Sequence, residues 1–91
     1  MIRDIVLEAI KAVNQELDKE FLNHLEDSTL LFENLDSFAI LDLILEIEDR
    51  LHSSYRKYIE IADETVMDEI KTPFKTVGSL IIYLENKITN A

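Results

Sequence analysis

The sequence predicts an all-α fold, a small three- to four-helix bundle. Apolar residues recur at three- and four-residue intervals over three long stretches, which is the spacing of helices that bury one face. An apolar fraction of 47% is typical of a folded globule. The length of 91 residues predicts one domain, spanning residues 1–91.

The first predicted helix spans residues 2–17, and its expected core face consists of Ile2, Ile5, Val6, Ala9, Ile10, Val13 and Leu17. Residues 18–26 follow as a short turn and residues 27–36 as a long loop, because Asp27 and Ser28 favour turns. The apolar side chains of these two segments that we expect to face the core are Phe21, Leu22, Leu25, Leu30, Leu31 and Phe32.

The strongest helical pattern covers residues 37–51, with Asp36 placed to cap its start. At 100° per residue its large apolar side chains cover an arc of about 220°. A helix this apolar needs packing on most sides, so we expect it to be the central helix. The arc comprises Phe38, Ile40, Leu41, Leu43, Ile44, Leu45, Ile47 and Leu51, and the acidic stripe opposite it comprises Asp42, Glu46 and Asp49.

Residues 52–73 are less regular, although Asp63 is placed to cap a short helix that continues to Ile70. The side chains of this short helix that we expect to point inward are Val66, Met67 and Ile70. Thr76 is placed to cap a last helix over residues 77–88. Its expected core face consists of Val77, Leu80, Ile81, Leu84 and Ile88.

The charge balance excludes several classes of partner. Nineteen acids against nine bases give a net charge of −10, which repels nucleic acid and anionic lipid but attracts basic protein surfaces.

The absence of cysteine excludes disulfides, thiolate zinc sites and cysteine catalysis. No apolar run reaches the roughly 18 residues of a membrane helix, and the first residues lack the plan of a signal peptide. We expect a cytoplasmic monomer without nucleic-acid partners or membrane insertion.

The pair Asp36-Ser37, at the start of a very apolar helix, carries the most chemical information. A serine at a helix start is ordinarily only a cap, but here Asp36 is the better cap. Activating a serine as a nucleophile needs a neighbouring base, and neither His24 nor His52 is placed by the sequence to supply one. We therefore expect no enzyme activity, but a serine to which another enzyme attaches a group. We expect both histidines to be exposed or half-buried.

Three stretches of the chain resemble the acyl carrier proteins. The first, similar to the family's Asp-Ser-Leu signature and second helix, is Asp36-Ser37-Phe38 with Leu41, Asp42, Leu43, Glu48, Asp49 and Leu51. The second, similar to a Leu-Phe-Glu-Asp-Leu loop, is Leu31-Phe32-Glu33-Asn34-Leu35. The third, from Phe74 to Leu84, resembles the family's last helix. The resemblance covers nearly the whole chain and implies a bundle of acyl-carrier type with a long first loop.

In that family the serine hydroxyl carries a 4′-phosphopantetheine arm, which a phosphopantetheinyl transferase moves from coenzyme A. The thiol of the arm then holds an acyl group as a thioester. The resemblance implies Ser37 as the attachment residue, Asp36 as its motif partner, and acyl-loading and acyl-transferring enzymes with basic surfaces as partners. The pathway implied is lipid or secondary-metabolite synthesis. The acidic residues implied in partner docking are Asp42, Glu46, Glu48 and Asp49. The residues expected to line an acyl pocket are Phe38, Leu41, Ile44, Leu45, Ile59, Ile61 and Met67.

Three features depart from the family pattern and point to a specialised carrier. Leu35 runs directly into Asp36 without the usual Gly-x, Phe38 replaces a leucine, and the segment 52–73 is longer than usual. We expect the longer segment to be a mobile lid that sets acyl selectivity. The shortened loop also supports an alternative function, a carrier-like protein-interaction module whose serine stays unmodified. A small hydrolase that uses Ser37 is a third reading, but the sequence shows no base and no oxyanion motif for it.

Overall fold

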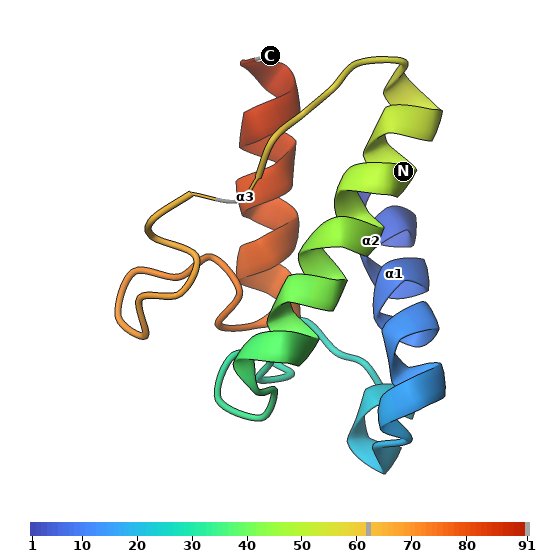
Figure 1. The fold of residues 1–91 in the computed structure, drawn as a ribbon, viewed down its shortest axis with the longest axis vertical. Helices are drawn as coiled ribbons and strands as arrows, with labels where there is room; N and C mark the ends of the chain where they lie inside the picture. Colours follow the sequence, from blue (N-terminus) through green and yellow to red (C-terminus); the bar gives the residue numbers. More distant parts are fainter. Residues whose placement is uncertain (62, 91) are drawn as a thin grey trace.

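The computed structural model describes residues 1–61 and 63–90, and there it has three α-helices and one short 3₁₀ helix (Figure 1). Their bounds are Ile2–Leu17 for α1, Glu20–Asn23 for η1, Ser37–Tyr55 for α2 and Val77–Thr89 for α3. Helices α2 and α3 run in the same direction and α1 in the opposite one, so both chain ends lie away from the start of α2 (Figure 1). The all-α class and the three long helices are confirmed.

Helix α1 packs against both other helices, whereas the Cα atoms of α2 and α3 all lie more than 8 Å apart. The expectation that the helix beginning at Ser37 is the central one is therefore wrong. The chain between α2 and α3 is held against α2, because the N–H of Ile61 donates to Glu48 Oε2 at 2.9 Å. The side chains by which this connection enters the core are Ile59, Ile61, Val66 and Phe74.

Backbone hydrogen bonds attach the long first loop to the residues that begin α3. The N–H of Leu31 donates to the carbonyl of Lys75 at 2.8 Å, and the N–H of Gly78 donates to the carbonyl of Asp27 at 2.8 Å. A Cβ atom at position 78 would lie 3.1 Å from that carbonyl oxygen, so the close approach favours glycine. From α1, Arg3 Nη1 lies 2.6 Å from Asp27 Oδ1. The loop is thus tied to both terminal helices.

The apolar residues that were expected to anchor residues 18–36 do so to different degrees. Leu22 and Leu31 are fully buried, whereas the side chain of Leu30 is exposed. The remaining three, which pack half-buried against the core, are Phe21, Leu25 and Phe32. The predicted short turn contains the 3₁₀ helix η1, and the predicted loop is confirmed.

The short helix expected from Asp63 to Ile70 is absent, and turns take its place. Asp63 Oδ1 accepts the N–H of Thr65 at 2.9 Å, and Asp68 Oδ1 accepts the N–H groups of Ile70 at 2.9 Å and Lys71 at 3.1 Å. Such local side-chain bonds compete with the helical hydrogen bonds of the backbone. Of the three side chains expected inward, only Val66 is buried, and those exposed are Met67 and Ile70.

Particular side chains hold the ends of the helices. The predicted cap of the last helix is confirmed: Thr76 Oγ1 accepts the N–H of Ser79 at 3.0 Å, and Ser79 Oγ accepts the N–H of Thr76 at 3.1 Å. The buried Asn14, which the sequence analysis did not single out, accepts the N–H of Lys19 at 2.8 Å and so fixes the chain reversal after α1. Helix α2 continues to Tyr55, beyond its predicted end.

Candidate functional site

Ser37 is the first residue of α2, and its side chain is exposed. Asp36 caps the helix as predicted: its Oδ1 accepts the N–H of Ala39 at 2.8 Å, and its carbonyl accepts the N–H of Ile40 at 3.0 Å. Within the described residues the hydroxyl of Ser37 makes no hydrogen bond. The fold therefore does not depend on this hydroxyl, which is free to carry an attached group.

The position of Ser37 also determines its electrostatic surroundings. Asp36 and its carbonyl satisfy the N–H groups of Ala39 and Ile40, which leaves the N–H groups of Ser37 and Phe38 without an acceptor in the described part of the chain. Free N–H groups at a helix start carry partial positive charge and favour an anionic group such as a phosphodiester. The partial positive charge of this helix start thus lies next to the carboxylate of Asp36.

The surroundings of Ser37 do not favour nucleophilic catalysis by this residue. His24 Nε2 lies 3.2 Å from Glu20 Oε1, and His52 Nδ1 lies 3.3 Å from the carbonyl of Lys57. Both imidazoles are exposed, and neither contacts Ser37 by a hydrogen bond. A serine nucleophile needs a base within hydrogen-bond reach. Neither imidazole of the described structure is placed as that base.

The four acidic residues expected to dock partners do not share one surface. Asp42, Glu46 and Asp49 line a groove between α1 and α2, to which α1 adds Glu16. Glu46 Oε1 accepts a hydrogen bond from Arg50 Nε at 3.0 Å, so part of its charge is compensated. Glu48 instead accepts the N–H of the buried Ile61. Asp42 and Asp49 are thus the exposed, unpaired acids of α2, and Glu48 has a structural task.

The seven residues expected to line an acyl pocket are divided between the core and the surface. Those buried in the core are Ile44, Ile59 and Ile61. Phe38 and Leu45 are 79% and 64% exposed, and Leu41 and Met67 are also exposed. The predicted arc of α2 was too broad, because its outer residues Phe38, Leu41 and Leu45 remain exposed. Phe38, Leu41 and Leu45, at successive three- and four-residue steps, form an apolar strip along the outside of α2, which we call the α2 strip.

The backbone of Ile61 is held on both sides of its Cα atom. Its N–H donates to Glu48 of α2, and its carbonyl accepts the hydroxyl of Tyr83 of α3 at 3.3 Å. The Tyr83 hydroxyl also lies 3.3 Å from Asp63 Oδ2. Burial, followed by the charge of Asp63, raises the pKa of Tyr83 to about 12. The hydroxyl of Thr65, donating to Asp63, is the main cause that lowers the pKa of this carboxyl.

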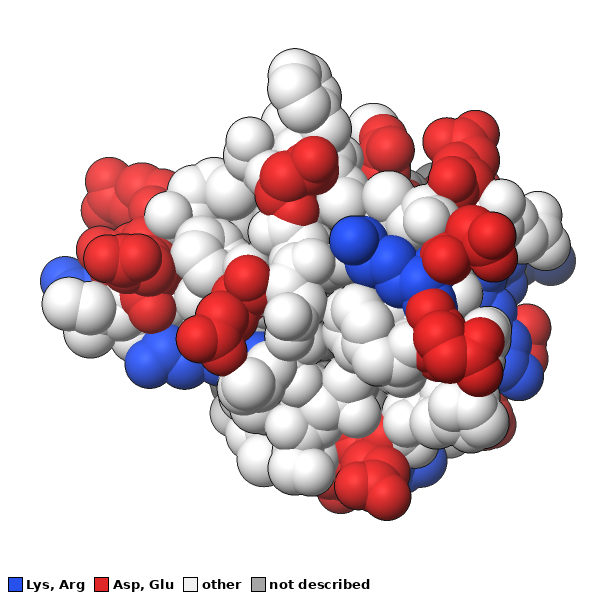
Figure 2. Space-filling model, turned by 90° about the horizontal axis from the view of Figure 1, so that it is seen from below, with Lys and Arg blue, Asp and Glu red and all other residues white. Residues whose placement is uncertain are grey.

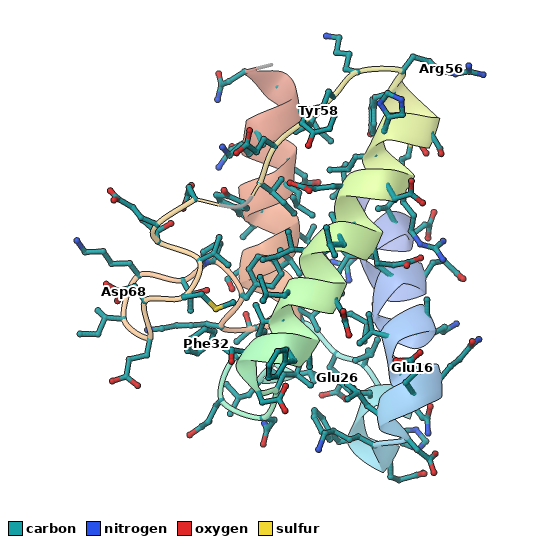
Figure 3. The ribbon with its side chains drawn as sticks, viewed as in Figure 1. Glu16, Glu26, Phe32, Arg56, Tyr58 and Asp68 are labelled. Carbon is teal, nitrogen blue, oxygen red and sulfur yellow. The ribbon has the colours of Figure 1, made fainter. Side chains whose placement is uncertain are left out.

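An open groove lies between the first loop and the residues that lead into α3. We call it the loop groove; it has a volume of about 450 Å³ and is lined by Leu30, Phe32, Glu33, Glu69, Ile70, Lys75 and Thr76. Figure 3 shows Phe32 between the first turns of α2 and the turn that carries Asp68. Seen from the end at which α2 and α3 begin, uncharged surface occupies much of the middle of the molecule, interrupted by a few acidic and basic side chains (Figure 2). The groove is not predictable from the sequence, because its walls come from segments far apart in the chain.

The fold and the site define a small acidic helical bundle with an exposed serine at the start of its longest helix. Comparison with protein families, with curated proteins and with solved structures finds no match to this chain. None of the described helices has both the length and the apolar character that a membrane crossing needs. The described residues also contain no cluster of potential metal ligands.

Proposed function

We propose that this protein is an acyl carrier, which holds an acyl group as a thioester on a 4′-phosphopantetheine arm attached to Ser37. The observation that carries the proposal is that Asp36, and not Ser37, caps the start of α2. Asp36 makes the capping hydrogen bond to Ala39, while the hydroxyl of Ser37 is exposed and takes no part in the fold. The protein itself performs no catalysis in this proposal, because the arm supplies the thiol that the cysteine-free chain lacks.

The helix start supports attachment of the arm at this serine. A phosphodiester on Ser37 would lie beside the free N–H groups of Ser37 and Phe38, where negative charge is favoured. These N–H groups of the chain would hold the negative charge of the arm's phosphodiester. The thioester chemistry belongs to the arm and to the partner enzymes.

Partner enzymes with basic surfaces fit the outside of α2. Asp42 and Asp49 are exposed acids beside the α2 strip, so a partner that offers an apolar patch with a basic rim would match both features. The net charge of −10 favours fast encounter with such a surface at low salt. The exposed Phe38 and Leu45 contribute to docking in this proposal, and not to an internal acyl pocket.

Intact mass after coexpression with a phosphopantetheinyl transferase tests the proposal. We expect the wild-type chain to gain the mass of one arm and Ser37→Ala to gain none. The matched control is Ser28→Ala, because Asp27-Ser28 is a second, exposed Asp-Ser pair that does not begin a helix. Retention of the arm by Ser37→Ala, or its loss in Ser28→Ala, would refute the site assignment.

The second candidate is a carrier-like interaction module whose serine stays unmodified. The observation that favours it is the direct step from Leu35 to Asp36, which shortens the loop that a modifying enzyme would recognise. The α2 strip serves partner binding equally well in this case. A chain that folds, yet keeps its unmodified mass with every transferase tried, would decide for this module.

A further inference from the structure

We propose that the loop groove binds the acyl chain carried by the arm on Ser37, on the outside of the bundle and not in its core. The inference rests on the proposed carrier function and adds to it the place of the acyl chain. It is drawn from three features of the structure: the nearness of the groove to Ser37, the closure of the core, and the charges at the groove rim.

The groove begins close to the attachment residue. Glu33, on its wall, precedes Ser37 by four residues, which span at most about 14 Å even when fully extended. The true separation is shorter, because the N–H groups of Asn34 and Leu35 both donate to the carbonyl of Leu31 and fold this stretch into a turn. The groove therefore lies within reach of a group attached to Ser37.

The core offers the chain no comparable entry. Ile44 and Ile61 are buried, and the backbone of Ile61 is fixed by Glu48 at its N–H and by Tyr83 at its carbonyl. These hydrogen bonds hold this segment closed against α2. The groove, in contrast, presents apolar side chains that are already exposed, with Ile70 76% and Leu30 45% accessible. Covering them removes apolar surface from water without opening the fold.

The charges at the rim select a tethered chain over a free fatty acid. Glu33 and Glu69 place two carboxylates on the groove, and Lys75 is the single base that lines it. The carboxylate of a free fatty acid would meet this net negative rim, and the whole molecule carries a charge of −10. A thioester is neutral and avoids this repulsion. The volume of the loop groove, about 450 Å³, lies within the range of sites that hold small molecules.

The test compares amide exchange in two forms of the protein, one with the bare arm on Ser37 and one with an octanoyl group on that arm. Both forms are first verified by intact mass. We expect exchange in peptides from residues 27–35 and 64–76 to slow by roughly tenfold on octanoylation, because burying two methylene groups corresponds to about that factor in an equilibrium constant. Ile70→Ser should abolish the slowing. The matched control Ile82→Ser, at an exposed site on α3 outside the groove, should retain it.

The exchange pattern distinguishes binding in the loop groove from binding in the core and from no binding. Both substituted side chains are exposed, so neither variant is expected to unfold the protein. Slowing confined to residues 43–61 would overturn the inference in favour of a core site, and no slowing anywhere in a verified octanoyl form would overturn it as well. Equal slowing by free octanoate would show that the ligand need not be tethered. A chain that never gains the arm fails at the mass measurement, and so refutes the carrier function before the groove is tested.

Discussion

Replacing Glu48 separates a structural acid from the docking acids of α2. Its Oε2 accepts the N–H of Ile61 at 2.9 Å, and Ile61 is fully buried. Glu48→Ala would leave that N–H without its side-chain acceptor at a half-buried place. Hydrogen bonds to charged groups contribute about 1.5–3 kcal/mol, and an unsatisfied buried donor costs about 1–3 kcal/mol. We therefore expect Glu48→Ala to lower the free energy of unfolding by about 2 kcal/mol.

Two further variants isolate the cause of this loss. Glu48→Gln keeps an oxygen that accepts the Ile61 N–H, so its expected loss is below about 1 kcal/mol. Asp42→Ala removes an exposed, unpaired acid of the same helix, so its expected change lies within about 0.5 kcal/mol. Urea unfolding monitored by circular dichroism gives the three free energies. At about 4–8 °C per kcal/mol, Glu48→Ala should also lower the melting temperature by roughly 10 °C.

The same three variants answer whether Glu48 docks a partner. If its role is structural, Glu48→Gln should take up the arm at nearly the wild-type rate, while Asp42→Ala should be slower. The reasoning fails if Glu48→Ala is as stable as Asp42→Ala, since the hydrogen bond to Ile61 would then contribute nothing. It also fails if Glu48→Gln loses as much stability as Glu48→Ala, since the charge and not the hydrogen bond would then matter.

Three further predictions concern other parts of the molecule. Gly78→Ala should lower the free energy of unfolding, measured in urea, by about 1 kcal/mol. The reason is that overpacking against the Asp27 carbonyl at 3.1 Å outweighs the helix preference of alanine. A variant more stable than the wild type would contradict this. Raising the pKa of Tyr83 from 10.0 to about 12 stabilises the fold fully below pH 10, and this contribution disappears as the pH rises towards 12. Melting temperatures from pH 9 to 12 should therefore fall less steeply in Tyr83→Phe, and parallel curves would argue against the shift. The double variant Asp42→Lys, Asp49→Lys should slow arm attachment. Added salt should also slow attachment to the wild type, because the Debye length falls from about 10 Å at 0.1 M to about 3 Å at 1 M. Rates that respond to neither change would exclude these acids from partner docking.

The helix starts could be predicted from the sequence because local chemistry decides them. Asp36 and Thr76 each precede an apolar periodic run, and both accept hydrogen bonds from the N–H three residues later. The exposed position of Ser37 follows from the same geometry, since a residue directly after the cap lies at the open end of the helix. The part of the candidate site that lies at the start of α2, Asp36 and Ser37, could therefore be predicted from the sequence.

The connection between α2 and α3 could not be predicted in the same way. The bonds from Asp63 and Asp68 to residues two and three positions later favour turns over the expected helix. The burial of α2 depends on which segment covers it, and that is a tertiary property. Because Ile59 and Ile61 cover one side only, Phe38 and Leu45 remain exposed although their spacing resembles that of core residues.

The common location of both chain ends has a practical consequence. Helix α1 begins at Ile2 and α3 ends at Thr89, both on the side of the bundle away from Ser37 (Figure 1). An affinity tag, a fluorophore or a link to a solid support placed at either end therefore leaves the serine facing the solution. Immobilised protein should accept a large enzyme at Ser37 without collision with the support. The labelling and exchange experiments above can thus be carried out on a captured chain.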